Sequence, residues 1–130
     1  MRQEPRQEPA PRLEQLRVHE ARGHTVLELR GEIDIAAATE IGPYLDRVTD
    51  RPGVRVVIDL RHIDFFDCSG LRLLYRAHHR VLDGGGQLQL VCVHPLTLRL
   101  LRVTGLSRLL PPRPTLDAAL DRSEASSGPV

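Results

Sequence analysis

Asp67, Cys68 and Ser69 place a carboxylate, a thiol and a hydroxyl side by side in the chain. A thiol becomes a strong nucleophile only when its pKa is lowered, and a serine hydroxyl needs an activating base before it attacks a substrate. The same hydroxyl can instead receive a phosphoryl group, or cap a helix by accepting a hydrogen bond from a free backbone N–H. Asp67 could serve as that cap equally well, so the spacing alone leaves these alternatives open.

The residues on either side predict a strand and a helix, with a short loop between them. Val56, Val57 and Ile58 form an apolar, β-branched run that is carried on to Leu60, which is typical of a central strand buried on both faces, and the strand is predicted over Val54 to Leu60. A helix is predicted from Ser69 to Asp83, and three consecutive glycines, residues 84–86, end it. Ser69 is therefore expected where a strand's carboxyl end meets a helix N-terminus, a usual place for sites in open α/β sheets and one that favours an added phosphate. The apolar face of the predicted helix consists of Leu71, Leu74, Tyr75, His78, Val81 and Leu82.

The segments before this unit predict a hairpin and another helix. Residues 13–19 and 25–30 alternate apolar and polar side chains, which predicts two antiparallel strands joined by a tight turn. A helix from about Ala36 to Thr49 follows Asp34, which can cap it. Pro43 is expected to kink this helix or to mark a broken first turn, because proline lacks the N–H of an intrahelical hydrogen bond.

The segments after the unit complete a small mixed sheet. Residues 87–93 predict a strand parallel to the earlier central strand, because a crossover helix joins the two. Residues 96–103 predict a third helix whose leucines cover more than one face, so that some are either covered by neighbouring segments or exposed as a partner site. A short edge strand is expected to begin at Leu109-Leu110, since two prolines follow. Thr115 is expected to cap a last helix, from Leu116 to about Leu120.

Length and charge limit the classes to which the chain can belong. It has 130 residues and a formal net charge of +1. This size fits one domain, expected over residues 13–121, with disordered polar tails over residues 1–12 and 122–130. The near-neutral charge and the low aromatic content argue against nucleic-acid binding. No apolar run reaches the roughly 20 residues that span a bilayer, and no signal peptide is present, so we expect a reduced cytoplasmic chain without membrane contact.

Catalytic and metal-site alternatives have little support in the sequence. A serine hydrolase needs a base and an oxyanion hole, and no G-x-S-x-G elbow surrounds Ser69. His62 is expected in a solvated loop, and His78 on the apolar face of its helix. The histidines and cysteines lack the closely spaced pairs of a zinc site. We therefore predict a binding protein without enzyme activity, metal or cofactor.

Four short motifs follow one another along the chain: Gly31-Glu32-Ile33-Asp34, Val57-Ile58-Asp59-Leu60, Phe66-Asp67-Cys68-Ser69-Gly70-Leu71 and Arg102-Val103-Thr104-Gly105-Leu106. With these motifs the chain resembles, over residues 13–121, the STAS domains of bacterial anti-sigma factor antagonists. In that family a partner anti-sigma factor, which is a kinase, phosphorylates the second hydroxyl residue of a D-S-[S/T]-G-L turn. That position is Ser69 here, and Cys68 replaces the usual serine.

The resemblance implies an α/β fold with a mixed sheet of about five strands and about four helices, mainly on one face. It implies that the unmodified chain binds an anti-sigma factor, an ATP-binding serine kinase of the histidine-kinase-like type, and so releases a sigma factor. Phosphorylation of Ser69 would end this binding and a serine phosphatase would restore it; the alternative is a scaffold role in a stress-signalling complex, with Ser69 unmodified. The expected surroundings of the phosphosite and partner surface are Asp34, Asp67, Cys68, Gly70, Leu71 and Arg72.

Overall fold

The computed structural model describes residues 13–126, and the side chains of residues 13–121. The tail expected over residues 1–12 lies outside the described residues, as does the end of the tail expected over residues 122–130. The elements follow in this order: β1 (Leu16–Ala21), β2 (His24–Ile33), α1 (Ile35–Thr49), β3 (Arg55–Phe66), α2 (Cys68–Asp83), β4 (Gln87–Val91), α3 (Pro95–Val103), α4 (Leu106–Leu109), β5 (Pro112–Arg113) and α5 (Leu116–Ser126).

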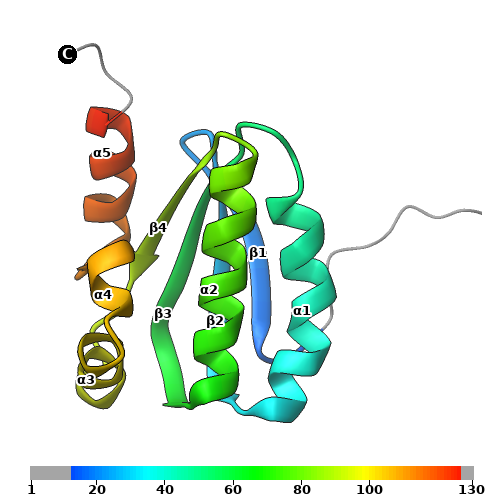
Figure 1. The fold of residues 1–130 in the computed structure, drawn as a ribbon, viewed down its shortest axis with the longest axis vertical. Coiled ribbons are helices and arrows are strands. Elements are labelled where there is room, and N and C mark those ends of the chain that lie inside the picture. Colours follow the sequence, from blue (N-terminus) through cyan, green and yellow to red (C-terminus); the bar gives the residue numbers. More distant parts are fainter. Residues whose placement is uncertain (1–12, 127–130) are drawn as a thin grey trace, which may run out of the picture.

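The strands form one mixed sheet in the order β1-β2-β3-β4-β5. β1 and β2 pair antiparallel as a hairpin, whereas β2, β3, β4 and β5 pair in parallel. Val56 pairs with Leu88 and Asp59 with Val91, which confirms the parallel pairing predicted across α2. The carboxyl ends of β2, β3 and β4 therefore lie at one edge of the sheet, the lower edge in Figure 1, where α1, α2 and α3 begin. We refer to it as the carboxyl edge.

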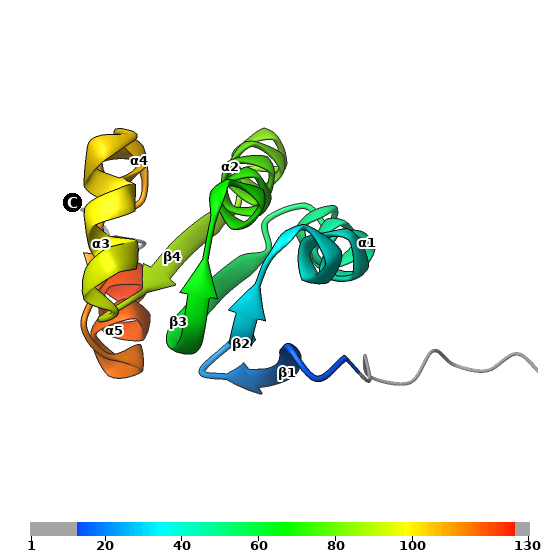
Figure 2. The ribbon, with the colours of Figure 1, turned by 90° about the horizontal axis from the view of Figure 1, so that it is seen from below.

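The two faces of the sheet bury two cores of unequal size. Figure 2 shows α1 and α2 together on one face, α5 on the other, and α3 and α4 beyond the β4 side of the sheet. The larger core fills the space under α1 and α2, and Leu27, Ile58 and Leu90 of three adjacent strands belong to it. Because successive strand residues point to opposite faces, β3 fills both cores, which explains its continuous apolar run. The smaller core consists of Val26, Val57, Val91, Ala119 and Leu120.

β3 is longer than predicted, because it continues past Leu60 to Phe66 and replaces the expected loop. In its second half only Ile63 and Phe66 are buried, and His62 is exposed on the strand rather than in a loop. β2 extends alongside it to Ile33, with irregularities in the register around Gly31. Polar residues on the solvent side hide this extension in the sequence, and the pairing of the two strands stabilises it.

Helix α1 begins directly after Asp34, whose Oδ1 accepts a hydrogen bond of 3.0 Å from the N–H of Ala37, as predicted for its cap. The helix runs through Pro43 as one element, so the expected broken turn does not occur. Gly42 helps to explain this continuity, since the residue before a proline is kept out of helical conformation partly by a clash of its Cβ, which glycine lacks. Pro43 itself is exposed.

The buried face of α2 differs from the predicted one in two residues. Tyr75 and Leu82 are 40% and 56% exposed. Neighbouring positions on the helix, Leu73 and Ala77, take their place in the core. A helix resting on a sheet has room for a stripe of apolar residues rather than for every apolar side chain in its sequence.

The last third of the chain contains more helix than predicted. The residues expected to begin an edge strand instead end the short helix α4, with Leu109 as its last residue and Leu110 as its C-cap, and β5 begins only at Pro112 as a two-residue strand at the sheet edge. Thr115 caps α5 as predicted, because its Oγ1 accepts a hydrogen bond of 3.0 Å from the N–H of Ala118. α5 then continues to Ser126 rather than ending near Leu120.

Candidate functional site

The side chain of Asp67 is the N-cap of α2. Its Oδ1 accepts a 2.8 Å hydrogen bond from the N–H of Ser69, and its carbonyl accepts from the N–H groups of Gly70 and Leu71 at 3.0 and 3.2 Å. Ser69 lies inside the first turn, and its hydroxyl makes no hydrogen bond to another described residue. The sequence left open whether Asp67 or Ser69 caps the helix. Asp67 is the cap, and the Ser69 hydroxyl has no structural hydrogen bond that a modification would break.

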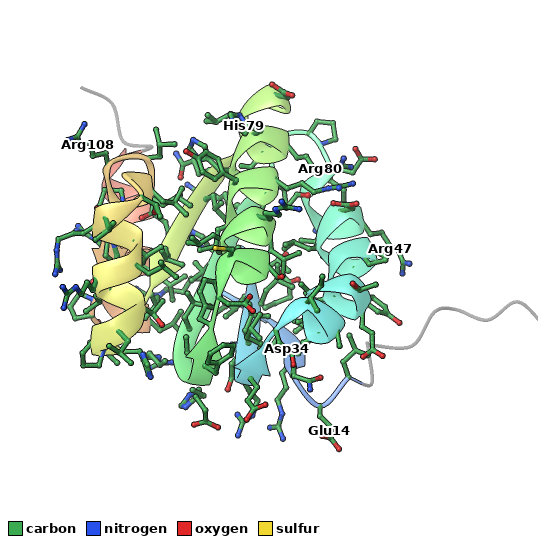
Figure 3. All side chains as sticks on the ribbon, turned by 60° about the horizontal axis from the view of Figure 1, so that its bottom comes forward. Glu14, Asp34, Arg47, His79, Arg80 and Arg108 are labelled. Carbon is green, nitrogen blue, oxygen red and sulfur yellow. The ribbon has the colours of Figure 1, made fainter. Side chains whose placement is uncertain are left out.

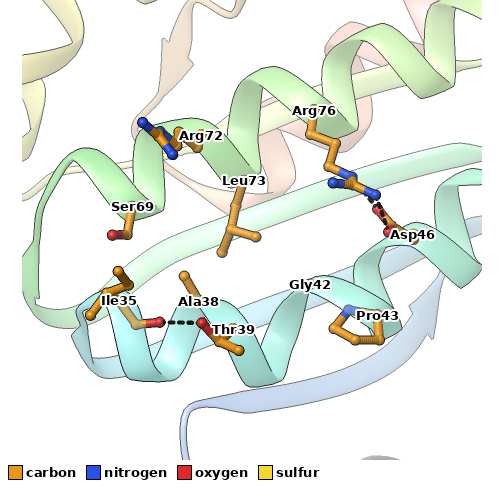
Figure 4. Close-up of a pocket in the computed structure, with 10 residues that line it drawn as sticks. All are labelled: Ile35, Ala38, Thr39, Gly42, Pro43, Asp46, Ser69, Arg72, Leu73 and Arg76. Carbon is orange, nitrogen blue, oxygen red and sulfur yellow. Dashed lines mark hydrogen bonds and ion pairs between the residues drawn. The ribbon is translucent and has the colours of Figure 1, made fainter.

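A groove of about 450 Å³ lies between α1 and α2, and Ser69 lines it at the N-terminal end of α2. Figure 4 shows the two helices side by side, with Ile35 at the start of α1 opposite Ser69. Apolar side chains, among them Ala38 and Leu73, form part of the lining. The groove therefore joins the first turns of two helices that the sequence separates by more than thirty residues.

Two arginines of α2 line the same groove, and only one of them is paired with a carboxylate. Arg76 is held by Asp46 of α1 through two short contacts, from Nε to Oδ1 at 2.8 Å and from Nη2 to Oδ2 at 2.7 Å. Arg72 is exposed and has neither an ion pair nor a hydrogen bond with any residue in the described part of the chain. Arg72 is therefore a cation available to a ligand or partner beside Ser69.

Gly70 allows the first turn of α2 to approach the end of β3. A Cβ at this position would lie 2.5 Å from Cε1 of Phe66, well inside van der Waals contact. Gly70 and Leu71 are both buried, so they position Ser69 and offer little surface to a partner. Of the residues predicted to surround the phosphosite, Cys68 and Arg72 are exposed, and Asp34 and Asp67 are half-buried caps of their helices.

No histidine lines the groove that contains Ser69. His78 lies nine residues further along α2, about 13 Å along the helix axis, and burial followed by the neighbouring His79 lowers its pKa. Figure 3 shows His79 toward the far end of α2, whereas Asp34 lies at the carboxyl edge. The residues with described side chains contain no cluster of three or more potential metal ligands, and none of the described helices is long and apolar enough to cross a membrane.

Large apolar side chains are exposed along the carboxyl edge, on both sides of Ser69. Ile35 follows β2 and is 71% exposed, Phe65 lies at the end of β3 and is 47% exposed, and Leu96 begins α3 and is 72% exposed. Exposed apolar side chains that gather at one edge are typical of a protein–protein contact surface. Sequence reasoning missed Ile35 and Phe65, although a large apolar residue directly beside a predicted strand end is a usable signal.

Comparison with known proteins agrees with this geometry. Residues 15–119 match the STAS domain family. The chain belongs to the STAS domain family. An anti-sigma F factor antagonist of Paenibacillus polymyxa is 26% identical over 98 residues, which are 75% of this chain and 84% of that protein.

Two solved structures place the STAS fold of this chain among known ones. The crystal structure of an anti-sigma factor antagonist from Mycobacterium paratuberculosis is 28% identical, with a TM-score of 0.73, and the match covers 84% of this chain and 92% of that one. The Bacillus cell fate determinant SpoIIAA, in its phosphorylated form, has a TM-score of 0.63 at 19% identity, covering 82% of this chain and 97% of that one, and shares the fold. The resemblance drawn from the sequence and the predicted fold class are confirmed.

Proposed function

We propose that this STAS domain is an anti-sigma factor antagonist, which binds an anti-sigma factor and so releases a sigma factor. The names of its relatives support this function. The observation that carries the proposal is the free hydroxyl of Ser69, which the helix cap does not use and which lies on an edge rich in exposed apolar side chains. A contact surface centred on Ser69 would carry no phosphate charge until that hydroxyl is modified.

Phosphorylation of Ser69 is the switch in this proposal. A phosphate adds roughly 1.5 to 2 negative charges at neutral pH. Inside a contact surface beside Ile35, these charges would have to lose their hydration, and the carboxylate of Asp67 would repel them. Binding to the anti-sigma factor should therefore weaken when Ser69 carries a phosphate.

The phosphoryl donor belongs to the partner in this scheme. The groove between α1 and α2 contains neither a histidine nor a phosphate-binding glycine loop, so ATP would be bound by the anti-sigma factor acting as a serine kinase. A serine phosphatase would return the chain to its binding form. Asp34, Asp67, Cys68 and Arg72 are the predicted site residues that would surround the reacting hydroxyl.

The test is a titration of the unmodified chain against its cognate anti-sigma factor, together with phosphosite mapping after incubation with that partner and ATP. Ser69→Ala should bind and take up no phosphate. Ser69→Asp should bind about tenfold to a hundredfold more weakly, which corresponds to about 1.4–2.7 kcal/mol. Ser107→Ala on α4 is the matched control, and it should bind and be phosphorylated like the unmodified chain. Phosphate on another residue, with unchanged binding by Ser69→Asp, would contradict the proposal.

A constitutive scaffold role is the second candidate, and the outer face of α3 favours it. Leu96 and Val103 of this helix are 72% and 76% exposed, so the apolar surface extends well beyond the Ser69 groove. The affinity of a scaffold contact through α3 would not depend on the charge at Ser69. Substituting Val103→Ser and Ser69→Asp in separate variants distinguishes the two: only the first should disrupt a scaffold complex, and the second should disrupt a phosphate-switched one.

A further inference from the structure

Arg72 is the nearest free cation to Ser69 along α2, and it has no counter-ion among the described residues. We propose that the Arg72 guanidinium pairs with the phosphate of phosphorylated Ser69 and holds it at the mouth of the groove between α1 and α2. This inference rests on the proposed phosphorylation of Ser69. It assigns to this chain a residue that fixes where the added charge lies.

The spacing of the two residues favours the contact. Ser69 and Arg72 are three positions apart within α2, and residues at that separation are neighbours on one side of a helix. Long helical side chains also lean toward the helix N-terminus, which directs an arginine at this position toward Ser69. Figure 4 shows the guanidinium of Arg72 directed toward the end of α2 where Ser69 lies.

Arg76 is a poor alternative partner for the phosphate. It lies seven positions from Ser69, about 10 Å along the helix, and Asp46 already holds its guanidinium at 2.8 and 2.7 Å. Arg72 would give up no ion pair within the described residues to bind the phosphate. A guanidinium can donate two parallel hydrogen bonds to a phosphate, a geometry that makes this pair stronger than a contact between point charges.

The other charged groups near the phosphate affect its ionisation in opposite ways. Asp34 and Asp67 are the carboxylates at the N-termini of α1 and α2, and they disfavour the doubly charged phosphate. Asp46 is neutralised by Arg76 at the other end of the groove. Arg72 and the N-terminus of α2 favour the dianion, so removal of Arg72 should raise the second pKa of the phosphate. Pairing with the phosphate would also withdraw Arg72 from the surface that the anti-sigma factor contacts.

The experiment incorporates phosphoserine at position 69 of the full chain during translation, so that no kinase is needed, and follows the ³¹P resonance of the protein against pH. Arg72→Gln should raise the apparent second pKa of the phosphate by roughly half a unit relative to wild type at the same ionic strength. Arg72→Lys keeps the charge and should restore part of the difference. Arg102→Gln removes the same charge from α3, outside the groove, and should leave the titration unchanged.

Equal titration curves for wild type and Arg72→Gln, with both proteins folded by thermal melting, would overturn the pairing. A shift of the same size in Arg102→Gln would overturn it as well, because the effect would then reflect net charge rather than a contact. Neither outcome bears on whether a kinase modifies Ser69. Conversely, failure of the anti-sigma factor to phosphorylate Ser69 would contradict the proposed function and leave this measurement intact.

Discussion

Asp67 and Ser69 divide two tasks that either residue type could perform. The carboxylate of Asp67 holds the N–H of Ser69 at 2.8 Å, and this leaves the serine hydroxyl without a structural partner in the described chain. The sequence could not decide between them, because both are good capping residues and the answer depends on whether the helix begins at Cys68 or after Ser69. A shift of two residues in the helix start decides which side chain is free.

Because Asp67 caps the helix and Ser69 does not, alanine substitutions at the two positions should lower the free energy of unfolding by different amounts. Asp67→Ala should lower the free energy of unfolding by about 1 kcal/mol, because the helix loses its cap. Ser69→Ala should change it by less than about 0.5 kcal/mol, since the hydroxyl makes no hydrogen bond in the described chain. Urea unfolding followed by circular dichroism measures both. The reverse order of costs would show that Ser69 is the cap in solution.

Gly70 provides a second prediction at this scale. A Cβ there would lie 2.5 Å from the Phe66 ring, so Gly70→Ala must displace the ring or the first turn of α2, at a cost of about 1–3 kcal/mol. Gly84→Ala is the matched control, because its φ is −88° and a Cβ would meet its nearest atoms at 3.6 Å. Thermal melts should separate the two variants. Adding Phe66→Leu should recover part of the loss, and no recovery would point to a different clash.

Helices and strands could be predicted from the sequence where apolar periodicity runs without interruption. The sequence predicted that a helix follows β3 for this reason. The apolar run of β3 precedes the connection, and the glycines at 84–86 mark the end of α2. The second half of β3 was missed, since its exposed face carries His62 and Asp64 and looks like a loop. α4 was missed because Leu109 and Leu110 fit a strand equally well, and a four-residue helix has too few residues to show a helical period.

Pro43 supports a prediction about an element as a whole. A proline inside a helix removes one hydrogen bond and costs up to about 3 kcal/mol, and here α1 continues through it. Pro43→Ala should therefore raise the free energy of unfolding by about 1–2 kcal/mol, the gain being offset in part by a more flexible unfolded chain. Chemical unfolding measures the change. A loss of stability would mean that the ring contributes packing in the groove that outweighs the helix penalty.

At the scale of the whole molecule, the parallel order of β2, β3 and β4 assembles the site. It brings the starts of α1, α2 and α3 to one edge, although they are far apart in the sequence. The sequence predicted the parallel pairing and the position of Ser69 at a strand end. It could not predict the groove or the free state of Arg72, because these depend on how closely α1 and α2 approach and on which arginine Asp46 captures.

The two cysteines test whether the larger core, which contains Cys92, is closed to solvent. Cys68 is exposed, whereas Cys92 is buried, and burial raises the pKa of its thiol. Iodoacetamide at pH 8 should therefore label Cys68 rapidly and Cys92 only after unfolding, since the thiolate is the reacting form. Mass spectrometry counts the labels, and Cys68→Ser should acquire none in the native state. Rapid labelling of Cys92 in the folded protein would reveal an open core around β4.

The exposed apolar side chains provide the last prediction, because two of them lie at the carboxyl edge and a third lies at the end of α2 that is farthest from it. Ile35 and Phe65 are at the carboxyl edge beside Ser69, whereas Leu82 is at the other end of α2 and is 56% exposed. All three are exposed in the free chain, so their replacement by serine should lower the free energy of unfolding by no more than about 1 kcal/mol.

Their effects on partner binding should differ sharply. Ile35→Ser and Phe65→Ser should each weaken binding of the anti-sigma factor by about 1–2 kcal/mol, or roughly fivefold to thirtyfold, because each loses apolar area that the partner would cover. Leu82→Ser should bind as the unmodified chain does. Isothermal titration against the anti-sigma factor measures all three. If Leu82→Ser weakened binding and Ile35→Ser did not, the partner would bind at the opposite end of α2 from Ser69. Phosphorylation of Ser69 could then not control that binding.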